Sequence, residues 1–408
     1  MSKTSTLHNP ARRQALFTAT GLAAAAMLAA CGGGGGDAGS AAAAGPATPA
    51  AASTYTLGAI AGFGSVIVGG VRFDDSGAEC VDEDGNSRDR SALKLGMVVA
   101  VDAGAVNRAD GTALALRIRL GSEIVGPVGT IDTVASTVQV LGQTVLVTTS
   151  TLFDETLAGG LSALTAGRVV EVYGILDPAN GRVVATRIEA EDSPAAYKLR
   201  GQIANLDTTA KTFTVNGQLV SYAGLPAATV PPGLTNGQIV RVLLQTTQVG
   251  GAWVATALRG GLRLPDRSGE AHLEGVISSF TSTTLFSVNG LPVDARNASF
   301  PDGSTGIALG ARVEVEGTVA GGVLVATKVE VEERRNAGMR SLELRGELGN
   351  LNSTAKTFAL RGVTVWYGGT VDWRDGSEAT LANGKRVEVR GVLSTDRTRL
   401  EARRIDFK

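Results

Sequence analysis

Residues 199–217 read LRGQIANLDTTAKTFTVNG and contain the pattern that predicts the fold. Leu199-Arg-Gly-Gln-Ile203 and Phe213-Thr-Val215 alternate apolar with polar residues, and this period of two is typical of strands with one buried face. The Asn-Gly pair that follows is a strong hairpin signal, because both residues of a tight type I′ turn need positive φ. The same arrangement returns at residues 286–290, FSVNG. The sequence therefore predicts a β-hairpin that the chain uses more than once.

Two series of glycines indicate that this unit is repeated five times. The first series is Gly58, Gly129, Gly201, Gly275 and Gly346, and the second is Gly96, Gly167, Gly237, Gly310 and Gly384. Both keep a spacing of 70 to 74 residues, which exceeds the roughly 20–50 residues of solenoid repeats and is long enough for a small domain. We therefore predict five repeats, at residues 55–123, 124–192, 197–264, 272–333 and 341–408.

Each repeat has the pattern of β-structure throughout. In the fourth strand of one repeat, Val313 and Val315 face one way while Glu314 and Glu316 face the other. About five such strands in roughly 65 residues need a curled sheet to enclose a core. We therefore predict an all-β chain of five tandem small β-barrels, each OB-like in strand count and order. A two-layer β-sandwich is the alternative.

The beginning of the chain has the pattern of an export signal. A basic, polar start and about 15 apolar residues precede Leu28-Ala-Ala-Cys31, which is typical of a secretory signal peptide and too short for a spanning helix of about 20 residues. We predict a signal peptide over residues 1–30. Residues 31–54, rich in Gly, Ala and Pro, predict a flexible tether.

Leu28-Ala-Ala-Cys31 also resembles the lipobox of bacterial lipoproteins. The resemblance implies cleavage before Cys31, a diacylglycerol on its sulfur and acylation of the new N-terminus, and several buried acyl chains give stable membrane anchoring. Gly32 stands where an aspartate is linked to inner-membrane retention in some bacteria. We therefore expect a lipid-anchored protein of the bacterial cell envelope, on the outer membrane and facing the periplasm or the cell surface. A cleaved signal with an incidental cysteine is the alternative.

The repeats themselves carry a second resemblance. Gly62-Phe-Gly-Ser-Val66 with Gly70-Val-Arg-Phe-Asp74, and the recurring Leu-x-x-Gly-x-x-Val-x-Val-x-Gly strands, resemble the bacterial family called domain of unknown function 5666. The resemblance covers nearly all of residues 55–408, with repeats one, two and four closest and repeat three most diverged. It implies tandem β-rich repeats, commonly in exported lipoproteins. Because the motifs are structural glycines and strand valines, it implies no catalytic residues.

Composition excludes several kinds of site. The formal net charge of the 408 residues is −1, which argues against a general nucleic-acid binder. The two histidines, His8 and His272, exclude a His-rich metal site, and the two cysteines, Cys31 and Cys80, exclude a disulfide scaffold and a four-cysteine zinc site. We therefore expect no cofactor and no nucleic-acid partner.

The densest acidic cluster is Asp82-Glu83-Asp84-Gly85-Asn86. Asp82, Asp84 and Asn86 are a weak candidate for a cation loop, because Ca²⁺ prefers clustered oxygen ligands. However, the glycine is fourth and position twelve is Leu93, so the cluster does not match an EF-hand loop. Asp-Gly-Asn is also favourable turn chemistry, and a solvated hairpin is the preferred interpretation.

Alignment of the repeats assigns three further residues. Cys80 aligns with Phe153, Phe300 and Trp373, which predicts a buried, inert core position. Trp366 follows the core position Val365 and is therefore expected to point outward. Trp366, with its neighbour Tyr367, is the candidate for a ligand or inter-repeat contact.

The five repeats carry net charges of −3, −5, +5, −5 and +3 in chain order. A basic third repeat between acidic neighbours suggests that the chain folds back so that complementary faces meet. We expect a non-enzymatic, envelope-tethered spacer or binding platform for a protein or a glycan.

Two alternatives remain open for the function. The first is a carbohydrate-active or other hydrolytic enzyme, which needs a carboxylate pair with a shifted pKa in a cleft between repeats. The second is weak binding of single-stranded nucleic acid or glycan in OB-like grooves, which needs basic tracks with aromatics. The basic repeat contributes few aromatics, such as Phe213, Tyr222 and Trp253.

Overall fold

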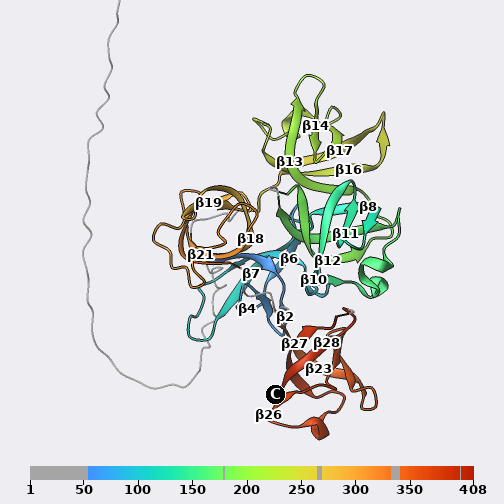
Figure 1. The fold of residues 1–408 in the computed structure, drawn as a ribbon, viewed down its shortest axis with the longest axis vertical. Coiled ribbons are helices and arrows are strands. Elements are labelled where there is room, and N and C mark those ends of the chain that lie inside the picture. The colour runs from blue at the N-terminus through green and yellow to red at the C-terminus, as the bar shows by residue number, and fades with distance from the viewer. Residues whose placement is uncertain (1–53, 178–179, 264–268, 332–340, 396) are drawn as a thin grey trace, which may run out of the picture. The chain divides into compact units, whose positions relative to one another are not determined.

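The computed structural model describes residues 54–177, 180–263, 269–331, 341–395 and 397–408. Apart from short 3-10 helices, every regular element in these ranges is a β-strand, which confirms the all-β prediction. The strands form small barrels that follow one another along the chain (Figure 1). Among the described residues, no helix is long and apolar enough to cross a membrane.

The elements are grouped here by barrel. Barrel 1 contains β1 (Thr54–Ala59), β2 (Gly62–Phe63), β3 (Val66–Val68), β4 (Val71–Asp74), β5 (Glu79–Asp82), η1 (Arg90–Ala92), β6 (Val98–Ala103) and β7 (Thr112–Leu120). Barrel 2 contains β8 (Ile124–Asp132), β9 (Thr137–Val140), β10 (Gln143–Phe153), η2 (Glu155–Leu157), η3 (Gly160–Ala163), β11 (Val169–Asp177) and β12 (Arg182–Ala190). Barrel 3 contains β13 (Tyr197–Asp207), β14 (Thr212–Val215), β15 (Gln218–Ser221), η4 (Ala227–Thr229), β16 (Ile239–Val249) and β17 (Ala252–Gly260). Barrel 4 contains β18 (Gly269–Ser282), β19 (Leu285–Val288), β20 (Leu291–Asp294), β21 (Arg312–Ala320) and β22 (Val323–Val331). Barrel 5 contains β23 (Leu342–Asn352), β24 (Thr357–Leu360), β25 (Val363–Trp366), β26 (Asp372–Arg374), η5 (Glu378–Thr380), β27 (Arg386–Leu393) and β28 (Leu400–Phe407).

Barrel 2 shows how each sheet closes on itself. β8 pairs antiparallel with β9, and β9 with β10. β10 runs parallel to β12, which pairs antiparallel with β11, and β11 returns to β8. The other barrels repeat this order, although the first strand of barrel 1 and the third strands of barrels 1 and 5 are each in two pieces. The result is a five-stranded barrel of the OB type, and not a sandwich.

Alternate residues of each strand fill the barrel interiors. In barrel 3, Phe213 and Val215 are fully buried and pack with Val240 and Val242 across the barrel. In barrel 1, Cys80 is 4% exposed within the core, and burial raises the pKa of its thiol, as expected for an inert core cysteine. The aromatic residues aligned with Cys80 pack against their cores but are only partly buried.

The hairpin predicted from Asn-Gly is present in every barrel. Its two turn residues have positive φ at Asn216 and Gly217 (44° and 84°). The equivalent pairs are Gly69-Gly70, Leu141-Gly142, Asn289-Gly290 and Arg361-Gly362, and all have positive φ. The turn geometry is thus retained even where a leucine or an arginine occupies its first position.

The strand register corrects one member of the first glycine series. The N–H of a second-series glycine donates to a backbone carbonyl oxygen that lies two residues after the first-series glycine. In barrel 3, Gly237 donates in this way to the carbonyl oxygen of Ile203 at 2.8 Å. In barrel 2 the acceptor is Val128, at 2.7 Å from Gly167. The equivalent glycine is therefore Gly126, and the assignment of Gly129 was wrong because Gly129 lies three residues further along the strand.

The barrels are joined through their first strands. β1 pairs in parallel with β18, β2 pairs in parallel with β23, and β8 pairs antiparallel with β13. Gly62 of β2 lies so close to β23 that an added Cβ would be 2.3 Å from the carbonyl oxygen of Glu343. The Gly-Phe-Gly motif therefore allows the backbones of two barrels to lie close together.

Candidate functional site

Three arginines lie side by side on the outer face of barrel 3. Arg200 on β13 is directly opposite Arg241 on β16, which is directly opposite Arg259 on β17. Side chains in such positions are about 5 Å apart at Cβ, and like charges there repel each other. This arginine row therefore needs carboxylates from elsewhere in the chain.

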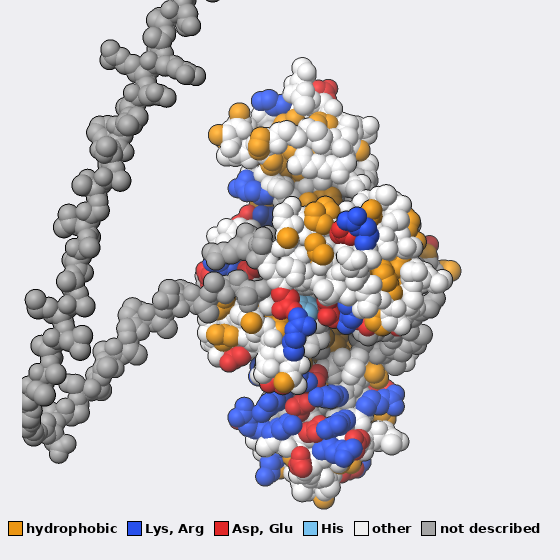
Figure 2. Space-filling view, turned by 90° about the vertical axis from the view of Figure 1, so that its left-hand side faces the viewer, with side chains coloured by type: hydrophobic (Ala, Val, Ile, Leu, Met, Phe, Trp, Pro, Cys, Tyr) orange, Lys and Arg blue, Asp and Glu red, His pale blue; other side chains and the backbone are white. Residues whose placement is uncertain are grey.

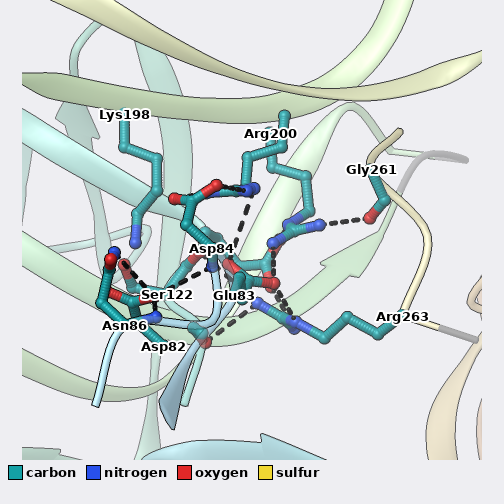
Figure 3. Close-up of polar contacts among 12 residues, drawn as sticks. Asp82, Glu83, Asp84, Asn86, Ser122, Lys198, Arg200, Gly261 and Arg263 are labelled. Atoms are coloured by element: carbon teal, nitrogen blue, oxygen red, sulfur yellow. Dashed lines mark hydrogen bonds and ion pairs between the residues drawn. The ribbon is translucent and has the colours of Figure 1, made fainter. Parts of the chain in front are cut away.

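Barrel 1 and the segment that follows it supply those carboxylates (Figure 3). Glu83 and Asp84 lie in the turn after β5, and Glu123 lies between β7 and β8. Arg200 donates to Glu83, and its Nε lies 3.2 Å from a Glu123 oxygen. Arg241 binds Asp84 with two hydrogen bonds of 2.8 and 2.6 Å, a bidentate geometry that is among the stronger charge-assisted pairs.

Arg263, which follows β17, connects the two glutamates. Its Nε donates to Glu83 at 2.8 Å, and its Nη1 lies 2.6 Å from Glu123. Its Nη2 donates to the carbonyl oxygen of Gly121 at 2.9 Å. We call the three carboxylates and three guanidiniums the Glu83 cluster: Glu83, Asp84, Glu123, Arg200, Arg241 and Arg263.

The Glu83 cluster is largely shielded from solvent. The side chain of Arg200 is 4% exposed and that of Glu123 is 1% exposed. Burial raises the pKa of Glu83, but Arg263 and Arg200 outweigh this effect and hold the pKa well below its usual range. Hydrogen bonds from Arg241 likewise lower the pKa of Asp84 against the effect of burial. All three carboxylates therefore face guanidiniums, and the formal charges of the cluster sum to zero.

A second ion pair extends the contact between barrels 2 and 3. Lys198 on β13 lies 3.6 Å from Glu171 on β11, and Ser122 donates to the same carboxylate oxygen at 2.6 Å. Burial lowers the pKa of Lys198, although Glu171 opposes this. The basic face of barrel 3 thus meets acidic residues from both preceding barrels, as the charges of the repeats suggested.

The candidate cation loop is organised differently from a metal site. Asp82 accepts hydrogen bonds from the N–H groups of Asp84 and Asn86, both at 2.9 Å, and Arg88 donates to it at 3.0 Å. Asp84 is held by Arg241. The described residues contain no group of three or more His, Cys, Asp or Glu side chains placed to hold a metal ion. The solvated-hairpin interpretation was wrong for Glu83, because this side chain is only 13% exposed and pairs with Arg200 of barrel 3.

A groove of about 860 Å³ between barrels 1, 4 and 5 is the place where a hydrolase site would be sought. It is lined by six glutamates: Glu270, Glu274, Glu314, Glu316, Glu330 and Glu343. Lys328 pairs with both Glu316 and Glu330. Arg72 and Arg390 both bind Glu343. Burial raises the pKa of Glu343, but Arg72 outweighs this and lowers it, whereas a general acid needs a raised pKa.

The tryptophan candidate lies on barrel 5. Val365 is fully buried, and Trp366 is half-buried on the opposite face of β25, with the Arg399 guanidinium 4.7 Å from its ring centre. The glycines at 368 and 369 lie against the same ring. The neighbouring Tyr367 is only 3% exposed and packs against Phe358 in the core. Tyr367 is therefore a core residue, and its assignment to a ligand contact was wrong because its ring points into the barrel.

The aromatics of the basic barrel are also committed to packing. Phe213 and Tyr222 are buried with ring centres 5.7 Å apart. Trp253 is partly buried, contacts the edge of Tyr197 and donates to Gln218 at 3.3 Å. Barrel 3 therefore does not present these rings as the stacking platform that binding of single strands uses.

Sequence reasoning did not single out Glu123, Arg200, Arg241 or Arg263. For the three arginines, the signal in the sequence was the net charge of +5 on the third repeat. This charge indicated that complementary faces meet, but not which residues meet. Cys31 lies outside the described residues.

Comparison with known proteins finds similarity to one family in part of the chain. Residues 125–189, 274–330 and 345–406 match the family described as "Domain of unknown function (DUF5666)". The three segments correspond to barrels 2, 4 and 5, so these three barrels are similar to this family. Barrel 3 is unmatched, in line with its expected divergence, whereas barrel 1 was expected to be among the closest and is also unmatched.

Other comparisons add little. No curated protein matches the chain. A solved structure titled "drosophila Unr CSD456" aligns with 53% of this chain and 98% of that chain, at 14% identity and a TM-score of 0.13.

Proposed function

We propose that this protein is a non-enzymatic scaffold of the bacterial cell envelope, anchored by lipid at Cys31, that serves as a spacer or binding platform for an envelope protein or a glycan. The observation that supports it best is the use of the Glu83 cluster. Its guanidiniums, from barrel 3 and the residues after it, bind carboxylates from barrel 1 and from the segment that follows barrel 1. Groups that could perform acid–base chemistry are thus used to hold barrels together.

Surface charge on barrel 5 supports the same proposal. Figure 2 shows Lys and Arg side chains interspersed with Asp and Glu over this barrel. Arg390 binds both Glu343 and Glu388, and Arg404 binds Asp406 at 2.6 Å. A mixed-sign outer face favours solubility without a single-sign field.

Envelope fractionation of the parent protein and a Cys31→Ser variant tests the anchor. We expect the parent in the membrane fraction and the variant in the soluble fraction, because the variant cannot carry the thioether-linked lipid. Affinity capture with the parent then identifies the partner. A soluble parent protein would contradict the lipid anchor.

The second candidate is a hydrolase with its site in the groove between barrels 1, 4 and 5. It is favoured by the six glutamates that line this groove. Incubation of the purified protein with cell-wall glycan, followed by measurement of released reducing ends, separates the candidates. Release that is lost in Glu314→Gln favours the hydrolase, and no release favours the scaffold.

A further inference from the structure

Arg259, the third member of the arginine row, differs from the residues at the same position in the other barrels. Those residues are all ion-paired: Arg119 with Asp102 at 3.1 Å, Glu189 with Arg187 at 2.8 Å, Glu330 with Lys328 at 3.2 Å and Asp406 with Arg404 at 2.6 Å. Arg259 donates to the carbonyl oxygen of Leu258 at 3.1 Å, and within the described part of the chain no carboxylate pairs with it. Barrel 3 therefore has a positive charge where barrels 2, 4 and 5 have a negative one, and its arginine, unlike Arg119 of barrel 1, pairs with no carboxylate among the described residues.

Arg259 lies at the wall of a groove of about 730 Å³ between barrels 1 and 3. This volume is within the range of about 300–1,000 Å³ that is typical of small-molecule sites. Five guanidiniums line the groove, from Arg119, Arg200, Arg241, Arg259 and Arg263, and the carboxylates among the lining residues are Glu83 and Asp84. Asp102 and Glu123, which are not among the lining residues, also pair with lining arginines. Among the described residues, five guanidiniums thus meet four carboxylates, and Arg259 is the guanidinium with no ion-paired carboxylate.

We propose that this groove binds a small oxyanion that carries two or more phosphate or carboxylate groups. Guanidinium is suited to this ligand because its planar fork binds such groups with two parallel hydrogen bonds. Arg241 is directly opposite Arg259 on the neighbouring strand, at the distance of about 5 Å that adjacent strands impose. One charged group of such a ligand binds Arg259, and the ligand extends toward Arg241, whose guanidinium also holds Asp84.

The site is independent of the scaffold proposal, since the barrels are held together whether or not the groove is filled. Its ligand chemistry is shared by phosphates and carboxylates, so the test uses one probe of each kind. Isothermal titration of the full chain with inorganic pyrophosphate, and separately with citrate, is carried out at low ionic strength. We expect at least one probe to bind, and Arg259→Gln to weaken binding about tenfold, because charge-assisted hydrogen bonds are lost.

Arg403→Gln is the matched control, because Arg403 is an exposed arginine on β28 of another barrel. We expect it to bind the probes as the parent does. An unchanged unfolding midpoint of Arg259→Gln shows that a loss of binding is not a loss of fold. Binding of pyrophosphate alone identifies a phosphate ligand, and binding of citrate alone identifies a carboxylate ligand. Absence of binding by both probes, or equal affinities of Arg259→Gln and the parent, would overturn the proposal.

Discussion

Glu83 remains charged in a buried place because Arg200 and Arg263 both donate to it. Glu83→Gln leaves two buried guanidiniums without their shared carboxylate. We expect the free energy of unfolding to fall by about 3–5 kcal/mol, which is typical of removing one partner from a buried ion pair. Calorimetric unfolding of the full chain measures the loss.

Glu79→Gln is the control for this substitution, because Glu79 lies on the same hairpin and forms an exposed pair with Arg117 at 2.8 Å. An exposed pair contributes about 0–1 kcal/mol, so we expect a small effect. Equal effects of the two substitutions would show that burial of the Glu83 cluster does not add to stability.

The lowered pKa of Glu83 also predicts a pH dependence. A carboxyl whose pKa is lower in the folded state stabilises that state above its unfolded pKa of about 4.3, and the contribution is lost as pH falls through the folded pKa. The difference in stability between the parent and Glu83→Gln is therefore expected to be constant near neutral pH and to shrink below about pH 4. Denaturation of both proteins from pH 3 to 7 measures it, and a gap that stays constant down to pH 3 would contradict the prediction.

At the residue scale, the sequence predicted the acidic turn but not its role. The run Asp82-Glu83-Asp84 was visible as a cluster of charges, and Asp-Gly-Asn correctly indicated a turn. The partners Arg200 and Arg263 are more than one hundred residues away, and local pattern does not state which distant side chains meet. Glu83 is shielded from solvent because barrel 1 packs against barrel 3. The local sequence pattern does not specify how barrels pack.

At the scale of elements, a second turn recurs between the first two strands of several barrels. In barrel 3, Asp207 accepts hydrogen bonds from the N–H groups of Thr209 and Ala210, both at 2.8 Å. Lys211 then adopts positive φ, 54°. For a residue with a Cβ this left-handed conformation costs about 1–2 kcal/mol, and Asn tolerates it better. The repeated segments DTVAST, DTTAKT and NSTAKT carried this signal in the sequence, but it was not recognised.

Lys211→Asn is therefore expected to raise the free energy of unfolding by about 0.5–1 kcal/mol. Lys211 is exposed, so the substitution removes little packing. Lys211→Ala is the control, because alanine, like asparagine, has a Cβ but lacks the short polar side chain whose local hydrogen bonds make the left-handed conformation tolerable. Thermal unfolding of the two variants gives the comparison, and equal midpoints would show that the turn is not strained at this residue.

At the scale of the whole molecule, periodicity predicted the barrels but not how they meet. Apolar residues at every second position indicate which face of a strand is buried. They do not indicate which strand edges pair between barrels. For the Gly-Phe-Gly motif at residues 62–64, the sequence leaves two interpretations, because a glycine in a strand indicates either a bulge or the close approach of another backbone. The structure shows the close approach, with Gly62 opposite Glu343 of β23.

Gly62→Ala tests whether this approach joins barrels 1 and 5. The new Cβ would lie 2.3 Å from the carbonyl oxygen of Glu343, and a backbone atom within a sheet does not swing aside as a flexible side chain does. The Arg72–Glu343 pair remains in the variant, but a partly exposed pair contributes only about 0–1 kcal/mol. We therefore expect the two barrels to separate while each stays folded.

Small-angle scattering is expected to show a larger radius of gyration for Gly62→Ala than for the parent, with an unchanged circular dichroism spectrum. Gly349→Ala is the matched control, because Gly349 lies on β23 and an added Cβ there would have no atom within 4 Å. We expect this control to scatter as the parent does. If Gly62→Ala also scattered as the parent does, the pairing of β2 with β23 would not be what holds barrel 5, and the ion pairs of Glu343 would have to account for the contact.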